Sequence, residues 1–181
     1  KIRARFPSLT IKDNGENRIY LDNPGGTQIC QSSLDQIQNY LLRNNANIGG
    51  TFRTSLDTDA VLLETRLAMS EFLNAETERE IVFGQNMTSL TFAISHSIKQ
   101  WVQPEHEIIV TRLDHDANIA PWLQLSDETG AKIRWIDFDP RDCTLNLESF
   151  EKLLTNKTKL VAVGYASNSV GTINPVKEIA A

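Results

Sequence analysis

Glu107-Ile108-Ile109-Val110-Thr111 is the stretch that decides the fold. Four consecutive β-branched residues without alternation of polar and apolar side chains are typical of a strand whose two faces are both covered. Such strands occur in parallel sheets between layers of helices. The stretch therefore predicts an α/β protein.

The sequence around this stretch alternates between strand and helix periodicity. Further strands are expected at 80–83, 132–136 and 159–165, which makes four in all. Helices are expected at 88–102, 117–128, 147–154 and after Pro175. One face of the first helix carries the apolar residues Leu90, Ile94, Ile98 and Trp101. The strand–helix–strand order predicts right-handed crossovers and a mostly parallel sheet.

The first 75 residues differ from the rest of the chain. They contain two helical stretches, 33–42 and 58–73, joined by the Asn/Gly-rich segment 44–50. We therefore expect a helical N-terminal arm at 1–75, followed by an α/β domain at 76–181.

Composition excludes several classes of function. The 181 residues include 18 Lys+Arg and 23 Asp+Glu, a net charge of -5, without the basic cluster that binding to nucleic acid requires. No run approaches the roughly 20 apolar residues of a membrane span. Cys30 and Cys143 are too few for a disulfide scaffold, which favours a reducing, cytoplasmic location.

Both ends of the chain are unusual. It starts on Lys1 rather than Met, and the stretch from Pro175 to Ala181 has the pattern of a first helical turn with no stop signal after it. We expect a fragment of a longer protein.

The segment 84–89, between the strand at 80–83 and the helix at 88–102, has the features of an anion site. Free backbone N–H groups and a helix N-terminus attract a phosphate, and Thr88 or Ser89 adds a hydroxyl donor. The alternative is that one of these two residues caps the helix.

Asp114-His115-Asp116 follows the decisive strand. One His between two acids is a weak set of metal ligands, because neighbours in an extended segment point in opposite directions. The alternatives are an Asp or Asn that caps the next helix, and a neutral imidazole whose ring faces a flat ligand.

Asn168 follows the last predicted strand, where it either forms a turn with Ser167 or donates an amide hydrogen bond to a ligand. Because ligands of parallel sheets bind at the carboxyl ends of the strands, these three segments are expected at one edge. Together they outline the pocket of an aromatic phosphate cofactor.

Four segments of the chain resemble the successive motifs of the class V aminotransferases, and most closely those of the cysteine desulfurases and selenocysteine lyases. The segments are Leu21 to Gly25, Asn86-Met87-Thr88, Asp114 to Trp122 and Ser167 to Pro175. The resemblance implies part of a fold-type I large domain, pyridoxal 5'-phosphate as cofactor, an amino-acid substrate and a homodimer.

The resemblance also assigns roles to residues. It implies that Met87 and Thr88 hold the cofactor phosphate, that His115 stacks on the pyridine ring and that Asn168 bonds the phenolic oxygen of the ring. Asn86 stands where the family usually has Gly, and Asp116 stands in place of a second His. Gly49-Gly50-Thr51 replaces a His-Arg-Gly stretch, so the substrate-facing residues differ.

The family's Schiff-base Lys, pyridinium-binding Asp, nucleophilic Cys and carboxylate-binding Arg have no counterpart within 1–181. The resemblance therefore implies the N-terminal part of an amino-acid-processing enzyme, with no catalytic residue of its own. Two alternatives stay open: a non-catalytic α/β module for protein interaction, and a metal-dependent hydrolase using Asp114, His115 and Asp116.

Overall fold

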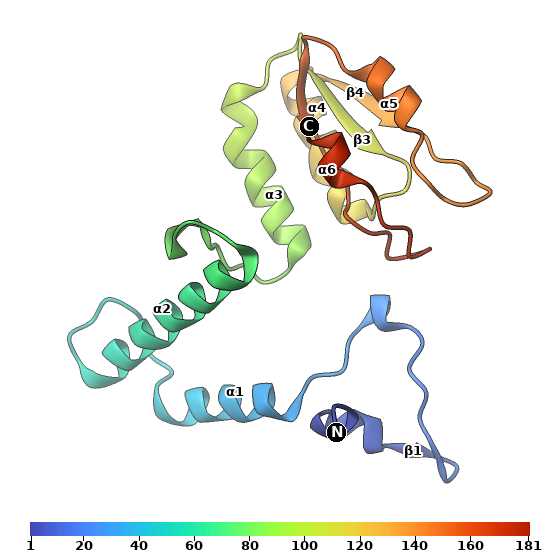
Figure 1. Ribbon diagram of the computed structural model, residues 1–181. Helices are drawn as coiled ribbons and strands as arrows, with labels where there is room; N and C mark the ends of the chain where they lie inside the picture. Colours follow the sequence, from blue (N-terminus) through green and yellow to red (C-terminus); the bar gives the residue numbers. More distant parts are fainter. The chain divides into compact units, whose positions relative to one another are not determined.

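The computed structural model describes all residues from 1 to 181 (Figure 1). The chain divides by its packing into two compact units, Lys1–Val82 and Phe83–Ala181. The expected division into a helical arm at 1–75 and an α/β domain at 76–181 stays a prediction. None of the helices combines the length and apolar composition that crossing a membrane requires.

The first unit is mainly helical, as the sequence predicts. Helix α1 spans Gln31–Arg43 and helix α2 spans Arg53–Leu73. Four short 3₁₀ helices accompany them: η1 (Arg3–Arg5), η2 (Pro7–Thr10), η3 (Asn23–Gly25) and η4 (Glu78–Glu80). A small antiparallel hairpin of β1 (Lys12–Asp13) and β2 (Glu16–Asn17) was not expected. Its turn is Asn14-Gly15, with φ of 53° and 89°, and Asn-Gly is the common pair for such a turn.

The predicted strand at 80–83 is wrong. The segment begins at the end of η4, where Thr77 and Glu80 form a reciprocal capping box, and continues without a paired strand. Ile81 is buried, but Val82 and Phe83 are exposed. An extended segment becomes a strand only when a neighbour satisfies its backbone groups, and here it has none.

The second unit contains a parallel three-stranded sheet in the order β4-β3-β5. Strand β3 spans Glu107–Thr111, β4 spans Lys132–Ile136 and β5 spans Thr158–Val161. The predicted bounds of β3 and β4 are confirmed, whereas β5 is shorter than predicted. All five residues of β3 are buried, which confirms the two covered faces.

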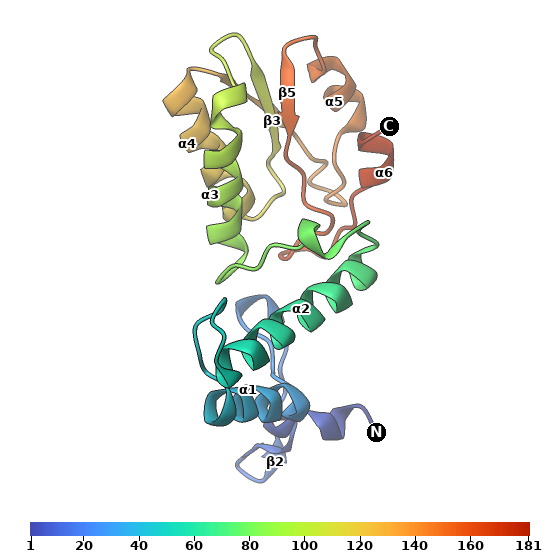
Figure 2. The ribbon, with the colours of Figure 1, turned by 90° about the vertical axis from the view of Figure 1, so that its left-hand side faces the viewer.

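Helices cover both faces of this sheet (Figure 2). Helices α3 (Met87–Ile98) and α4 (Ala120–Thr129) lie on one side, and α5 (Leu147–Leu153) and α6 (Val176–Ile179) lie on the other. Two more 3₁₀ helices, η5 (Lys99–Trp101) and η6 (Asp116–Asn118), flank α3 and α4. Gly130 ends α4 in the left-handed conformation with φ of 78°, as the sequence predicts.

Alternate residues of β3 supply two hydrophobic cores. Ile108 and Val110 join Trp122 and Leu125 of α4 in one core. Ile109 joins Ile136 of β4 and Phe150 of α5 in the other. The decisive stretch therefore contributes to both layers of the fold.

The buried face of α3 is only partly the predicted one. Ile94 is 54% exposed and Trp101 is 58% exposed, while Thr91 and Ser95 are buried. Their hydroxyls donate to the carbonyl oxygens of Met87 and Phe92, at 2.9 and 2.8 Å. Of the predicted apolar residues, Ile98 packs against the core. Since these local bonds satisfy the hydroxyls, the small polar side chains of Thr91 and Ser95 are buried beside it in place of Ile94.

Glu107, at the beginning of β3, links this strand to β4 and to the segment that precedes β5. Its Oε1 accepts hydrogen bonds from Nε and Nη2 of Arg134, and its Oε2 accepts one from the hydroxyl of Thr155. The side chain is only 6% exposed. The hydrogen bonds from Arg134 and Thr155 hold the pKa of Glu107 below its ordinary value of 4.5.

Replacement of Glu107 by Gln should weaken the acid sensitivity of the fold. A carboxylate with a lowered pKa stabilises the folded state above pH 4.5, and this contribution is lost as the pH falls through the folded-state pKa. In urea denaturation between pH 6 and 3, the free energy of unfolding of E107Q should fall less steeply below about pH 4.5 than that of the wild type. Exposed Glu151, replaced by Gln, is the control. Equal slopes for E107Q and wild type would contradict the prediction.

Candidate functional site

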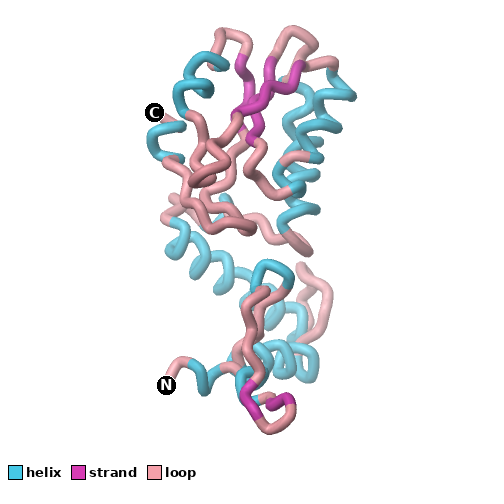
Figure 3. Tube along the Cα trace, turned by 90° about the vertical axis from the view of Figure 1, so that its right-hand side faces the viewer, coloured by secondary structure: helices cyan, strands magenta, loops and turns pink.

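Three polar segments of the second unit gather at one edge of the sheet. Because β3 and β5 are parallel, the segments that follow them leave the sheet at the same end. Helix α3 begins at this end and packs against η6 (Figure 2). In Figure 3 the segments after the strands are loops. The predicted common edge is confirmed for the segments after β3 and β5. The segment 84–89 follows no strand, and it comes to this edge through the packing of α3 against η6.

Asn86 caps α3. Its Oδ1 accepts hydrogen bonds from the backbone N–H and the hydroxyl of Ser89, at 2.9 and 3.0 Å. The expectation that Thr88 or Ser89 caps the helix is therefore wrong, because the preceding amide takes the position. The N–H groups of Met87 and Thr88 have no hydrogen-bond partner, and neither does the Thr88 hydroxyl. Both residues are exposed, so these donors are free to bind an anion.

His115 begins η6. Its Nδ1 accepts a hydrogen bond from the backbone N–H of Ala117 at 3.0 Å. An accepting Nδ1 places the proton of the neutral ring on Nε2. The imidazole is exposed. The alternative that an Asp or Asn caps the next helix is wrong, because His115 caps η6 and the N-cap of α4, Ile119, has no side-chain cap.

Asp114 is the most connected side chain at this edge. Its Oδ2 accepts hydrogen bonds from the Thr111 hydroxyl at 2.7 Å and from the N–H of Gly164 at 3.0 Å. Its Oδ1 accepts one from Nδ2 of Asn118 at 3.0 Å. The carboxylate thus joins the end of β3 to the segment after β5. Sequence reasoning considered Asp114 only as a metal ligand or cap and missed this role.

Asn168 lies in the turn of the loop after β5. Ala166 and Ile173 pair at the base of this loop. The turn is made by Ser167, whose hydroxyl accepts from the N–H groups of Ser169 and Val170 at 3.3 and 3.4 Å. Asn168 is exposed and its side-chain amide makes no hydrogen bond within the chain. Its amide is therefore available to a ligand.

Asn174 is a second residue that sequence reasoning missed. It is 4% exposed and donates from Nδ2 to the carbonyl oxygen of Gly164 at 2.7 Å. Its Oδ1 is buried without a hydrogen-bond partner. The only sequence signal was the pair Asn174-Pro175, which indicates a turn or helix start rather than a buried amide.

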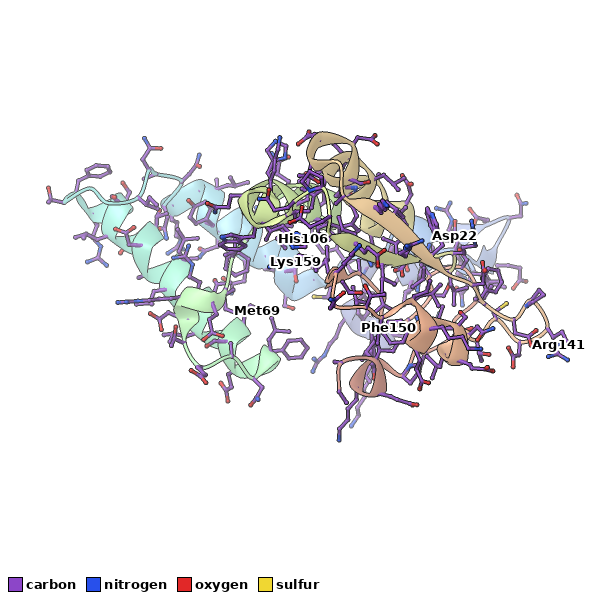
Figure 4. All side chains as sticks on the ribbon, turned by 90° about the horizontal axis from the view of Figure 1, so that it is seen from above. Asp22, Met69, His106, Arg141, Phe150 and Lys159 are labelled. Atoms are coloured by element: carbon purple, nitrogen blue, oxygen red, sulfur yellow. The ribbon has the colours of Figure 1, made fainter.

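The geometry gives a metal site little support. No three His, Cys, Asp or Glu side chains come together as a ligand set, and both oxygens of Asp114 already accept hydrogen bonds. A hollow of about 560 Å³ in this unit is lined by the loop between β4 and α5 rather than by the predicted site residues. Arg141 extends from the outer part of that loop (Figure 4).

The free groups at this edge fit a pyridoxal phosphate. Two unpaired N–H groups and a hydroxyl at a helix N-terminus suit a phosphate. An exposed imidazole and an unpaired amide suit a flat ring with a polar substituent. The structure places Met87, Thr88, His115 and Asn168 on the three segments at this edge. Their contacts with a cofactor stay a prediction.

Comparison with known proteins places the chain in a family. The family model for aminotransferase class-V matches residues 19–181. A probable cysteine desulfurase of Synechocystis is 33% identical over 99% of this chain and 43% of its own length. An aminotransferase-like protein FGM3 of Gibberella zeae is 35% identical over 99% of this chain and 44% of its own length.

Solved structures agree with the sequence comparison. The apo cysteine desulfurase of Thermococcus onnurineus matches with a TM-score of 0.83 and 28% identity, over 89% of this chain and 40% of that one. The chain therefore spans less than half the length of these relatives. The predicted resemblance and the fold-type I α/β architecture are confirmed. The chain belongs to the class V aminotransferase family.

Proposed function

We propose that this chain is the N-terminal part of a pyridoxal 5'-phosphate-dependent enzyme that acts on an amino acid. The observation that carries the proposal is the pair of unpaired N–H groups of Met87 and Thr88 at the start of α3. The names of its relatives, cysteine desulfurase and aminotransferase-like protein, support this class of reaction. When bound, the cofactor supplies an electron sink for the substrate.

The start of α3 binds the phosphate in this proposal. The N–H groups of Met87 and Thr88 point out of the first turn, where the helix dipole favours negative charge. The Thr88 hydroxyl adds a donor from the same turn. Since Asn86 already takes the N–H of Ser89, these donors are the ones left for a ligand.

His115 and Asn168 orient the ring. The imidazole presents its face or its Nε2–H, because Nδ1 is engaged by the N–H of Ala117. The amide of Asn168 donates to the oxygen on the ring. The two residues come from the segments after β3 and β5, so the sheet edge sets their spacing.

The segment 49–51 differs from the family in the residues that face the substrate. Gly49 and Gly50 stand in place of charged side chains of the family, and their N–H groups are held by Asp59 and Ser55 of α2. These two glycines therefore present neither a charged side chain nor a free N–H group. We propose an amino acid as the substrate, and either desulfuration or amino-group transfer as the reaction.

We also propose a cytoplasmic homodimer. Helices α1 and α2 leave several large apolar side chains exposed, and burial of such side chains favours association with a protein partner. The exposed residues of these helices include Ile37, Leu41, Leu42, Leu63, Leu67 and Phe72. The free thiols of Cys30 and Cys143 fit a reducing compartment.

The full-length protein should bind pyridoxal phosphate on a lysine. Borohydride reduction should bleach the visible absorbance of the cofactor and leave it covalently attached, as seen by peptide mass spectrometry. Absorbance without an adduct would contradict a Schiff-base enzyme, and no cofactor binding at all would contradict the proposed function.

Thr88→Val should weaken cofactor binding. Loss of one hydrogen bond to a charged phosphate costs about 1.5–3 kcal/mol, or roughly tenfold or more in Kd. Thr88→Ser should bind like the wild type, because it keeps the hydroxyl. Ser89→Ala is the matched control, since its hydroxyl already donates to Asn86. Titration of the apo protein followed by absorbance measures Kd, and equal affinities of T88V and S89A would refute the assignment.

Charged residues on α2 should break the dimer. Leu63 and Leu67 are one helical turn apart and are 51% and 50% exposed. Replacement of both by Glu should convert a dimer into a monomer in sedimentation velocity, because it places like charges in an apolar interface. Leu154→Glu, on an exposed leucine after α5, should leave the mass unchanged. A monomeric wild type would contradict the proposal.

A further inference from the structure

Gly164 is held on both sides at the edge of the sheet. Its N–H donates to Oδ2 of Asp114 at 3.0 Å, and its carbonyl oxygen accepts from Nδ2 of Asn174 at 2.7 Å. A Cβ at this position would lie 2.5 Å from Oδ1 of Asp114, so no larger residue fits without movement. The loop that carries Asn168 begins directly after this fixed point.

Asp114 also fixes the segment that carries His115. It precedes His115 in the chain, bonds the hydroxyl of Thr111 at the end of β3 and accepts from Nδ2 of Asn118 in η6. One carboxylate therefore restrains the bases of two loops, one with the ring-facing imidazole and one with the free amide.

The hydrogen bonds around Asp114 have a fixed direction. Nε1 of Trp122 donates to Oδ1 of Asn118 at 3.2 Å, and Nδ2 of Asn118 donates to Asp114. Both ends of the Asn118 amide are thus assigned. Asp114 has to accept all of its bonds, a condition that an ionised carboxylate meets and an amide does not.

We propose that Asp114 is a positioning residue that sets the spacing of His115 and Asn168, and through it the affinity for the cofactor. The inference rests on the proposed function, because the cofactor is what the two side chains are spaced to hold. Asp114 itself accepts only from protein donors, so it acts through the loops and not on the ligand.

The direction of the hydrogen bonds supplies the test. In Asp114→Asn, the new Nδ2 faces another donor in either orientation of the amide: Nδ2 of Asn118 or the N–H of Gly164. A flip of the Asn118 amide does not help, because its Nδ2 would then face Nε1 of Trp122. In the double variant D114N/N118D, the amide introduced at position 114 donates to the carboxylate introduced at position 118, and that carboxylate also accepts from Trp122. The double variant keeps the net charge and the size of the pair. In it, every hydrogen-bond donor again faces an acceptor.

Glu107→Gln is the matched control. Glu107 is also a carboxylate that bonds across strands, but it lies at the opposite end of β3. If any loss of sheet stability weakened the cofactor site, E107Q would weaken it as well.

Two measurements on the full-length protein decide the matter. The first is the Kd for pyridoxal phosphate, by absorbance titration of the apo protein. We expect about a tenfold increase for D114N, less than about threefold for D114N/N118D, and no change for E107Q. The second is hydrogen exchange of the Gly164 amide without cofactor, which should be faster in D114N and return toward the wild-type rate in the double variant.

Each result has a defined meaning. Wild-type affinity in D114N, or an equal loss in E107Q, overturns the positioning role while the proposed function stands. Restored protection of Gly164 without restored affinity in the double variant also overturns it. If D114N does not fold, a double variant that folds but binds weakly overturns it in the same way. Failure of the wild type to bind the cofactor overturns the proposed function and this inference together.

Discussion

The complete burial of β3 is the constraint on which the second unit depends. A strand with both faces and both edges covered needs a helix layer on each side and a neighbour on each edge, and the structure supplies all four. Its backbone can leave the sheet only at its two ends. The carboxylates that join β3 to its neighbours therefore lie where the strand begins and just after it stops.

The carboxylates near the two ends of β3 have different roles. At the start, Glu107 joins Arg134 and Thr155, and all of its partners are structural. At the end, Asp114 joins Thr111, Asn118 and Gly164, and two of these lie in segments that carry exposed, unpaired groups. A carboxylate that accepts several hydrogen bonds thus stabilises the sheet at one end and restrains the loops at the other. Position on the sheet, and not residue type, separates the two roles.

The sequence correctly predicts those elements that are determined by their own local residues. The β-branched run of β3 and the stop at Gly130 depend on local sequence alone, and both are confirmed. The strand at 80–83 depended on a partner that sequence does not reveal. The prediction of the buried face of α3 was partly wrong, because the hydroxyls of Thr91 and Ser95 form local hydrogen bonds and can be buried. Asp114 and Asn174 were missed because their partners lie 50 and 10 residues away, at Gly164.

Asn86 shows how one departure from a family pattern changes the chemistry of a helix start. A Gly at this position offers no side chain, so every free N–H of the first turn remains open to an anion. Asn86 instead keeps the N–H of Ser89 for itself. One N–H group of the turn, that of Ser89, is therefore occupied by the cap, and the N–H groups of Met87 and Thr88 stay free. The cap stabilises the helix in the absence of a ligand. Any anion bound here is consequently held by fewer backbone donors, and the hydroxyl of Thr88 carries a larger share of its binding.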